Sequence, residues 1–114
     1  MRFVGVPETP GDIAGDVFID YERPDIERQK LPLYLDEVNH SPTGFAWNYY
    51  GSGPAQLAYA ILRHVTNSRN MARRLYQRFE GEHIARLGKG EWAIDEDLVT
   101  GWIWEQEEQD AATD

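Results

Sequence analysis

The sequence predicts an α+β fold, in which a small, mostly antiparallel sheet of three or four strands packs against three helices. Short β-prone segments, joined by turns that contain Pro and Gly, occupy the first 50 residues. Apolar residues then recur at helical spacing from residue 52 onward. With 114 residues, of which 41% are hydrophobic, the chain has the size and apolar content of one compact core. We therefore expect a single α+β domain over residues 1–104 and an acidic, frayed C-terminal tail over residues 105–114.

The amino-terminal part is expected to consist of strands and turns. Residues 2–6 (RFVGV) and 17–21 (VFIDY) are β-prone, and the segment between them supplies Pro and Gly for a connection. Residues 22–32 are polar and predict a loop, whereas residues 33–38 (LYLDEV) predict another short strand. In residues 45–50 (FAWNYY), alternate side chains would point to opposite faces of a strand, and one face is expected to be buried.

The first helix is expected to follow this strand directly. Ser52 or Gly53 would be its N-cap, and Pro54 fits the first turn because an N–H group there has no helical partner anyway. An apolar stripe at helical spacing predicts one buried face, formed by Leu57, Ala58, Ile61, Leu62 and Val65.

Two more helices are expected after it. Asn67 or Ser68 can cap the second helix, and Gly81 predicts a bend within it. Gly88 is suited to end that helix in a left-handed conformation. Asp95 is suited to be the N-cap of the third helix, because carboxylates are favoured at the positive end of the helix dipole.

The net charge of −9 is distributed unevenly along the chain. Residues 1–62 carry four basic and nine acidic side chains, and residues 63–89 carry seven basic and two acidic ones. Residues 90–114 carry nine acidic side chains and no basic one. The basic middle segment is expected to be a solvated helix face that the acidic end can neutralise within the molecule.

Composition also restricts the class of protein. Without cysteine, the chain has no disulfide, no thiolate metal site and no cysteine nucleophile. The amino terminus lacks a basic start followed by a long apolar run, and no stretch reaches about 18 apolar residues. We expect a soluble, cytoplasmic protein that is neither exported nor anchored in a membrane.

The most distinctive candidate site in the sequence is the corner at residues 51–56 (GSGPAQ). A strand that turns through small residues into a helix directs backbone N–H groups and the positive helix end toward one point, where an anion can bind. The corner lacks the lysine and the glycine spacing of nucleotide-binding loops, and Pro54 removes one N–H donor. Two interpretations stay open: a ligand or carboxylate site, or a tight turn that needs glycine only for its backbone.

The remaining polar residues do not combine into a catalytic or metal site. Glu37 and His40 have the spacing of half a di-iron motif, but the other half is missing. His64 and His83 lack acidic partners at matching spacing. Ser41 is adjacent to His40, which disfavours the geometry of a catalytic triad, and no nucleophile elbow is present. We expect a non-enzymatic protein with no catalytic residue, no metal and no cofactor.

The charged segments offer two further hypotheses. The basic residues between positions 63 and 89 could contact phosphates, but a net-acidic domain repels nucleic acid, so direct binding is not expected. In the second hypothesis the acidic end imitates a phosphate backbone and occupies a basic groove on a partner protein. Acidic tails also serve solubility alone.

Residues 41–62 (SPTGFAWNYYGSGPAQLAYAIL) resemble an uncharacterised family of small proteins from bacteria, haloarchaea and their plasmids or phages. The core motif of that family reads approximately S-P-T-G-F-x-W-G-Y-x-G-S-G-P-A-Q-L-A, and this chain has Asn48 where the motif has Gly. The resemblance implies no known activity, but it indicates one structural or binding unit and is compatible with a mobile-element or accessory role. We expect the ligand-binding residues of this unit to be Ser41, Thr43, Trp47, Tyr50, Gly51, Ser52, Gly53 and Gln56.

The expected function is that of a small accessory binding or adaptor protein. Its partner would be a small anionic ligand received by Ser52 and nearby N–H groups, with an amide from Gln56 and an aromatic wall from Trp47 or Tyr50. The alternative is an acidic protein-interaction inhibitor from a phage or plasmid, which would bind a nuclease or another basic protein through its C-terminal end. The oligomeric state does not follow from the sequence.

Overall fold

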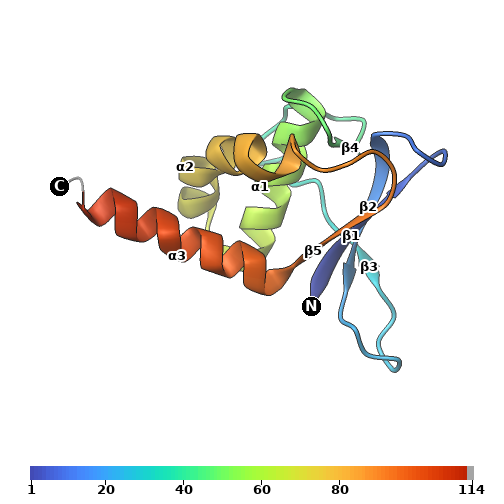
Figure 1. Cartoon of the computed structure of the whole chain (residues 1–114), viewed down its shortest axis with the longest axis horizontal. Coiled ribbons are helices and arrows are strands. Elements are labelled where there is room, and N and C mark those ends of the chain that lie inside the picture. The colour runs from blue at the N-terminus through green and yellow to red at the C-terminus, as the bar shows by residue number, and fades with distance from the viewer. Residues whose placement is uncertain (113–114) are drawn as a thin grey trace.

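The computed structural model describes residues 1–112 and confirms the α+β fold with three helices and an antiparallel sheet (Figure 1). The elements in chain order are β1 (Arg2–Pro7), β2 (Ala14–Asp20), β3 (Gln29–Lys30), β4 (Phe45–Ala46), α1 (Ser52–Thr66), α2 (Arg69–Phe79), the π-helical turn η1 (Glu80–Ile84), β5 (Trp92–Asp95) and α3 (Glu96–Ala112).

The sheet is built around the hairpin of β1 and β2, which are paired from Arg2 opposite Asp20 to Pro7 opposite Gly15. Its strand order is β3-β2-β1-β5, and β4 also pairs with β2. One edge of β2 is paired with β1. The other edge is shared by β3, which pairs near Phe18, and by β4, which pairs near Gly15. The short stretch of β2 between these two pairings forms one wall of the groove described below.

The strand β5 was not predicted. It is only four residues long, but Trp92 and Ile94 are buried while Ala93 and Asp95 are exposed, which is the alternation of a half-buried strand. It pairs with β1 and therefore brings the C-terminal part of the chain beside the N-terminal strand.

The strand predicted over residues 33–38 was wrong. Tyr34 has a φ of 58°, in the left-handed region, and the backbone N–H groups of Glu37 and Val38 both donate to the Tyr34 carbonyl oxygen, at 3.0 and 3.1 Å. These residues form a turn within a loop from Leu33 to Ser41, which we call the 33–41 loop. The polar segment before it is a loop as predicted, apart from the two residues of β3.

The strand predicted over residues 45–50 stops after Ala46. Asn48 has a φ of 75°, which a strand cannot accommodate, and so the predicted alternation fails and Phe45, Ala46 and Trp47 are all buried. Two hydrogen bonds hold Asn48 in place. Its N–H group donates to the Ile84 oxygen at 3.1 Å, and its side-chain amide donates to the Leu87 oxygen at 2.6 Å.

Helix α1 lies at the centre of the molecule, between the sheet and α2 (Figure 1). Ten consecutive residues, from Gly53 to Leu62, are buried, and so the helix is enclosed on all sides and not only along the predicted stripe. Its N-cap is Gly51, one residue before the predicted position, and Pro54 does lie in the first turn.

The start of α2 follows the prediction, whereas its end does not. Ser68 is the N-cap, and its Oγ accepts a hydrogen bond from Met71 N at 3.2 Å. Gly81 lies in the π-helical turn η1, where a bend was expected. The predicted left-handed cap at Gly88 was wrong, since the nearby glycine with positive φ is Gly90, at 87°.

Helix α3 continues through residues 105–112, where a frayed tail was predicted; positions 113–114 lie outside the described residues. Arg74 and Arg78 of α2 explain the difference. Arg74 pairs with Glu107 and, at 2.6 Å, with Asp110, and Arg78 pairs with Asp110 at 3.2 Å. Each exposed pair alone contributes about 0–1 kcal/mol, but together they dock the acidic helix on the basic one.

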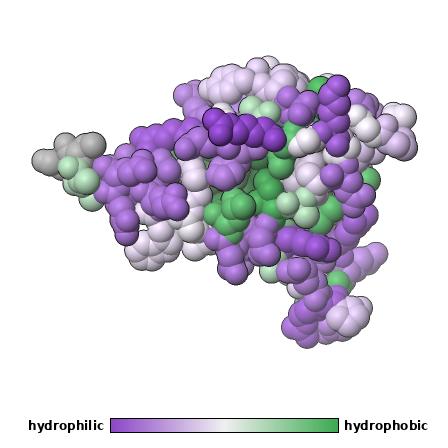
Figure 2. All heavy atoms as spheres, in the orientation of Figure 1, coloured by the Kyte–Doolittle hydropathy of each residue, from purple (hydrophilic) through white to green (hydrophobic). Residues whose placement is uncertain are grey.

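The outer half of α3 projects beyond the rest of the molecule and carries hydrophilic side chains on the visible face, whereas apolar side chains show mainly in the centre (Figures 1 and 2). Within residues 1–112, no helix combines the length and the apolar character that crossing a membrane requires.

The conformation of Asn48 leads to a prediction about stability. Asn48→Gly should lower the free energy of unfolding by about 1 kcal/mol, the value of the one side-chain hydrogen bond that is lost. It should add no backbone strain, because glycine adopts positive φ readily. Asn48→Val should cost roughly 1–3 kcal/mol more, because a β-branched residue is strained there. Urea unfolding of both variants measures the difference, with Asn70→Val on the exposed surface of α2 as the control. Equal losses for Gly and Val would contradict the assignment.

Candidate functional site

A groove with a volume of about 610 Å³ opens beside the glycine corner. Residues 14–17 of β2 form one wall, and the chain from Ser41 to Ala46 forms another. The start of α1 closes the groove at Ser52 and Gly53. The groove is therefore made by segments far apart in the sequence.

Four of the predicted site residues line this groove: Ser41, Thr43, Ser52 and Gly53. The Ser41 hydroxyl donates to the Gly44 oxygen at 2.8 Å, which stabilises the turn at the rim. Thr43 and Ser52 are exposed, and in the part of the chain that the structure describes their hydroxyl groups make no hydrogen bond. These two hydroxyls are available to a ligand.

The exposed aromatic residue at the groove is Tyr49, which was not among the predicted ligand-binding residues. Its ring lies over the corner, so that a Cβ atom on Gly51 would come within 2.6 Å of the ring. A Cβ atom on Gly53 would come within 2.6 Å of the Ala46 methyl group. Close packing against Ala46 therefore requires glycine at position 53, whereas a side chain at position 51 would have to displace the exposed ring of Tyr49. This packing supports the structural interpretation of the corner.

The N–H group of Gly51 is not available to a ligand, because it donates to Glu80 Oε2 at 2.9 Å. Glu80 lies in η1 and is buried. Burial raises the pKa of Glu80, whereas the hydrogen bond from Gly51 and the charge of His40 oppose this rise. The positive end of α1 is therefore complemented by a carboxylate of the protein itself.

Gln56 is 0% exposed, and its amide makes four hydrogen bonds within the chain. Its Oε1 accepts from the N–H groups of His40 and Ser41, at 2.8 and 3.2 Å. Its Nε2 donates to the carbonyl oxygens of Leu33 and Val38, at 2.6 and 2.8 Å. The amide thus fastens both ends of the 33–41 loop to α1, and this role is structural.

The two aromatic residues of the predicted set lie outside the groove lining. Trp47 is fully buried, and its ring contacts that of Trp92 edge to face, with the ring centroids 5.5 Å apart. Tyr50 is 66% exposed, and its ring lies close to Gly81 of η1. The structure therefore divides the predicted set into groove residues, core residues, one exposed tyrosine and Gly51, whose N–H group binds Glu80.

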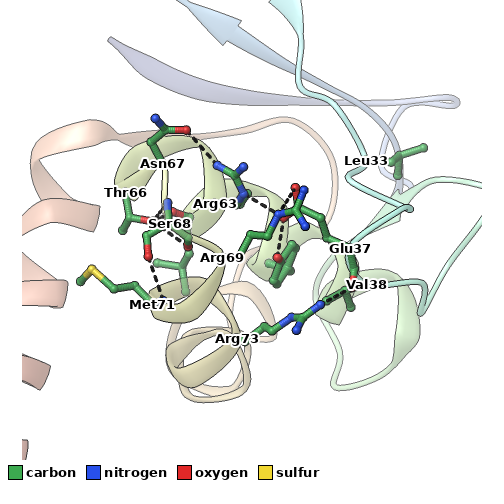
Figure 3. A network of polar contacts seen from close by, with 12 residues as sticks. Leu33, Glu37, Val38, Arg63, Thr66, Asn67, Ser68, Arg69, Met71 and Arg73 are labelled. Carbon is green, nitrogen blue, oxygen red and sulfur yellow. Dashed lines mark hydrogen bonds and ion pairs between the residues drawn. The ribbon is translucent and has the colours of Figure 1, made fainter.

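A separate cluster surrounds Glu37 in the 33–41 loop (Figure 3). Glu37 and His40, which have metal-ligand spacing, do not share a site: Glu37 binds arginines, whereas His40 Nε2 lies 2.8 Å from the Tyr76 hydroxyl. Among residues 1–112, no three side chains of His, Asp or Glu come together in a way that could hold a metal ion.

Fold and groove together define a small α+β protein whose central helix begins beside a solvent-open groove lined by both polar and apolar residues. A family model described as a family of unknown function (DUF6166) matches residues 12–105, and the chain belongs to this family. The match includes every residue that lines the groove except Glu8, and both sides of the glycine corner. Comparison with curated proteins and with solved structures gave no match.

The role of Gln56 leads to a second prediction. Gln56→Leu should lower the free energy of unfolding by about 3 kcal/mol or more, because four backbone groups lose their partner at about 1–3 kcal/mol for each one that stays buried. Urea unfolding measures the loss, and hydrogen exchange should rise in the 33–41 loop. Gln77→Leu on the exposed side of α2 is the matched control. A Gln56→Leu variant as stable as the control would contradict the structural role.

Proposed function

We propose that the protein is a non-enzymatic binding module whose groove takes a small polar ligand. The observation that carries this proposal is the pair of exposed hydroxyl groups of Thr43 and Ser52, which have no hydrogen-bond partner in the described chain and line the same groove as the Tyr49 ring. A concave site with a few convergent polar groups and an aromatic wall is the usual form of a small-molecule site.

The charges of the lining favour a neutral polar ligand over an anion. The ionisable side chains of the groove are Glu8, Asp16 and Lys30, and Lys30 Nζ lies 3.6 Å from Asp16 Oδ2. Glu80 already accepts from the corner N–H group that an anion would use. A ligand with hydroxyl or amide groups can instead pair with the free hydroxyls without bringing further negative charge.

This proposal predicts a saturable response to one class of polar compound. Amide chemical shifts would be recorded while sugars, amino acids, nucleosides and their phosphorylated forms are added separately. We expect shifts around Thr43 and Ser52, and a dissociation constant about tenfold higher in the Thr43→Val, Ser52→Ala double variant, because each hydrogen bond contributes about 0.5–1.5 kcal/mol. Thr100→Val on exposed α3 is the control. Absence of saturable shifts, or equal weakening by the control, would count against the groove.

A second candidate function is protein interaction through α3, and it is favoured by the exposure of Trp104 and Leu98, at 67% and 45%. Gly101 lies between them at helical spacing, and nothing stands within 4 Å of the position of a Cβ atom there. Glu105 and Glu108 flank the same face. An exposed tryptophan beside a bare glycine, with carboxylates on the same face, fits a partner protein that has an apolar pocket and basic surroundings.

This second candidate is an acidic interaction protein or inhibitor, and it can be tested without truncating α3. Deleting residues 105–114 would remove the partners of Arg74 and Arg78, so a point variant is preferable. In affinity purification from the native host, a basic partner should be recovered with the unaltered protein. Its recovery should fall at least about tenfold with Trp104→Ala, the loss of one interfacial hot spot. Equal recovery with Trp104→Ala would exclude this surface, and the Thr43→Val, Ser52→Ala variant should behave as the unaltered protein.

A further inference from the structure

Three arginine side chains converge on Glu37 in the 33–41 loop (Figure 3). Arg63 Nε lies 2.8 Å from Glu37 Oε1, and Arg69 Nε lies 3.3 Å from Glu37 Oε2. Arg73 Nη2 donates to the backbone oxygen of Glu37 at 3.0 Å. The three guanidinium groups are therefore held within hydrogen-bond distance of a single residue.

The charges in this cluster do not balance. One carboxylate stands against three guanidinium groups, which leaves an excess of two positive charges, and Asp36 makes no ion pair with any described residue. Burial opposes the ionisation of Glu37, but hydrogen bonds from Tyr59 and Arg63 and the arginine charges lower its pKa. Glu37 is therefore ionised at neutral pH and holds the arginines in place without cancelling their charge.

The other arginines of α2 show that this excess is local. Arg74 and Arg78 are paired with carboxylates of α3, whereas Arg69 and Arg73, which lie four residues apart, face the 33–41 loop. The helix thus has a neutralised side and a cationic side. Since the whole chain carries a net charge of −9, a cationic cluster on its surface is not a result of composition.

The cluster combines a buried carboxylate, that of Glu37, with exposed guanidinium groups that keep N–H donors available. The Glu37 side chain is 4% exposed, and both its oxygens are occupied, Oε1 by Tyr59 and Arg63 and Oε2 by Arg69. Arg69 is 60% exposed and uses only Nε, so both its Nη groups remain. Arg73 uses only Nη2 within the described chain. Arg63 is braced by Asn67 at 3.0 Å and by the ring of Tyr34.

We propose that Arg69 and Arg73, positioned by Glu37 and Arg63, bind a phosphate dianion, either free phosphate or the phosphomonoester group of a metabolite. Planar guanidinium groups with paired N–H donors match the oxygens of phosphate, and a doubly charged oxyanion balances an excess of two positive charges. A long polyanion is disfavoured, because the rest of the acidic protein repels it. This site uses none of the groove residues and is independent of the ligand proposed there.

The test is a titration of the intact protein with sodium phosphate and, separately, with O-phosphoserine, at constant ionic strength in chloride. Side-chain arginine Nε–H signals and amide signals would be followed by NMR. We expect saturable shifts at Arg69 and Arg73 for both probes. The Arg69→Gln, Arg73→Gln variant should raise the dissociation constant at least tenfold, and Arg69→Lys should lie between, because lysine keeps the charge but not the fork.

Arg74→Gln is the matched control on the neutralised side of α2, and it should bind phosphate as the unaltered protein does. Amide spectra of each variant would show that it is folded. The proposal is overturned if phosphate gives no saturable shift at Arg69 and Arg73, or if Arg74→Gln weakens binding equally. Tighter, arginine-dependent binding of a DNA oligonucleotide would overturn it in favour of nucleic acid. Shifts confined to Thr43 and Ser52 would locate the anion in the groove and also overturn it.

Discussion

The amide of Gln56 is the contact on which both proposed sites depend. It projects from the central helix, is sealed from water and satisfies two donors and two acceptors of the 33–41 loop. Because a buried polar group without a partner is costly, these four bonds fix the path of a loop that has no regular secondary structure. That path carries Glu37 toward the arginines and Ser41 to the rim of the groove. One side chain of α1 therefore helps to set the geometry of both the Glu37 cluster and the groove.

At the glycine corner, a carboxylate of the protein itself complements the positive end of α1. A helix start favours a negative group, and Glu80 supplies one from a neighbouring turn. The N–H group of Gly51, which was expected to bind an external anion, instead binds Glu80 and so holds η1 against α1. Positive charge that no internal carboxylate matches is found instead around Glu37, and exposed hydroxyls are found at the groove. The three features differ in the chemistry that they offer.

Local residue patterns predicted the helices well and the loops poorly. The start of α2 followed from Ser68, because an N-cap bonds within its own turn. The extent of α3 did not, since its last turns depend on Arg74 and Arg78, about 30 residues earlier in the chain. The left-handed conformation of Asn48 also depends on distant partners, although asparagine in place of a motif glycine was a usable signal. Gln56 was expected to contact a ligand but is buried, whereas Tyr49, which was not among the predicted site residues, lines the groove. Only tertiary packing decides which side chain faces a groove.

The pairing of β5 with β1 also determines when the fold can be completed. Trp92 closes against Trp47, and the N–H group of Glu96 donates to the Met1 oxygen at 3.0 Å, so segments some 90 residues apart meet at one sheet edge. Until that edge forms, the enclosed helix α1 lacks part of its cover, and contacts of such long range form slowly. The chain therefore reaches its native topology only after the region around Trp92 has been synthesised and has paired with β1, and until then apolar residues of α1 lack part of the core that buries them.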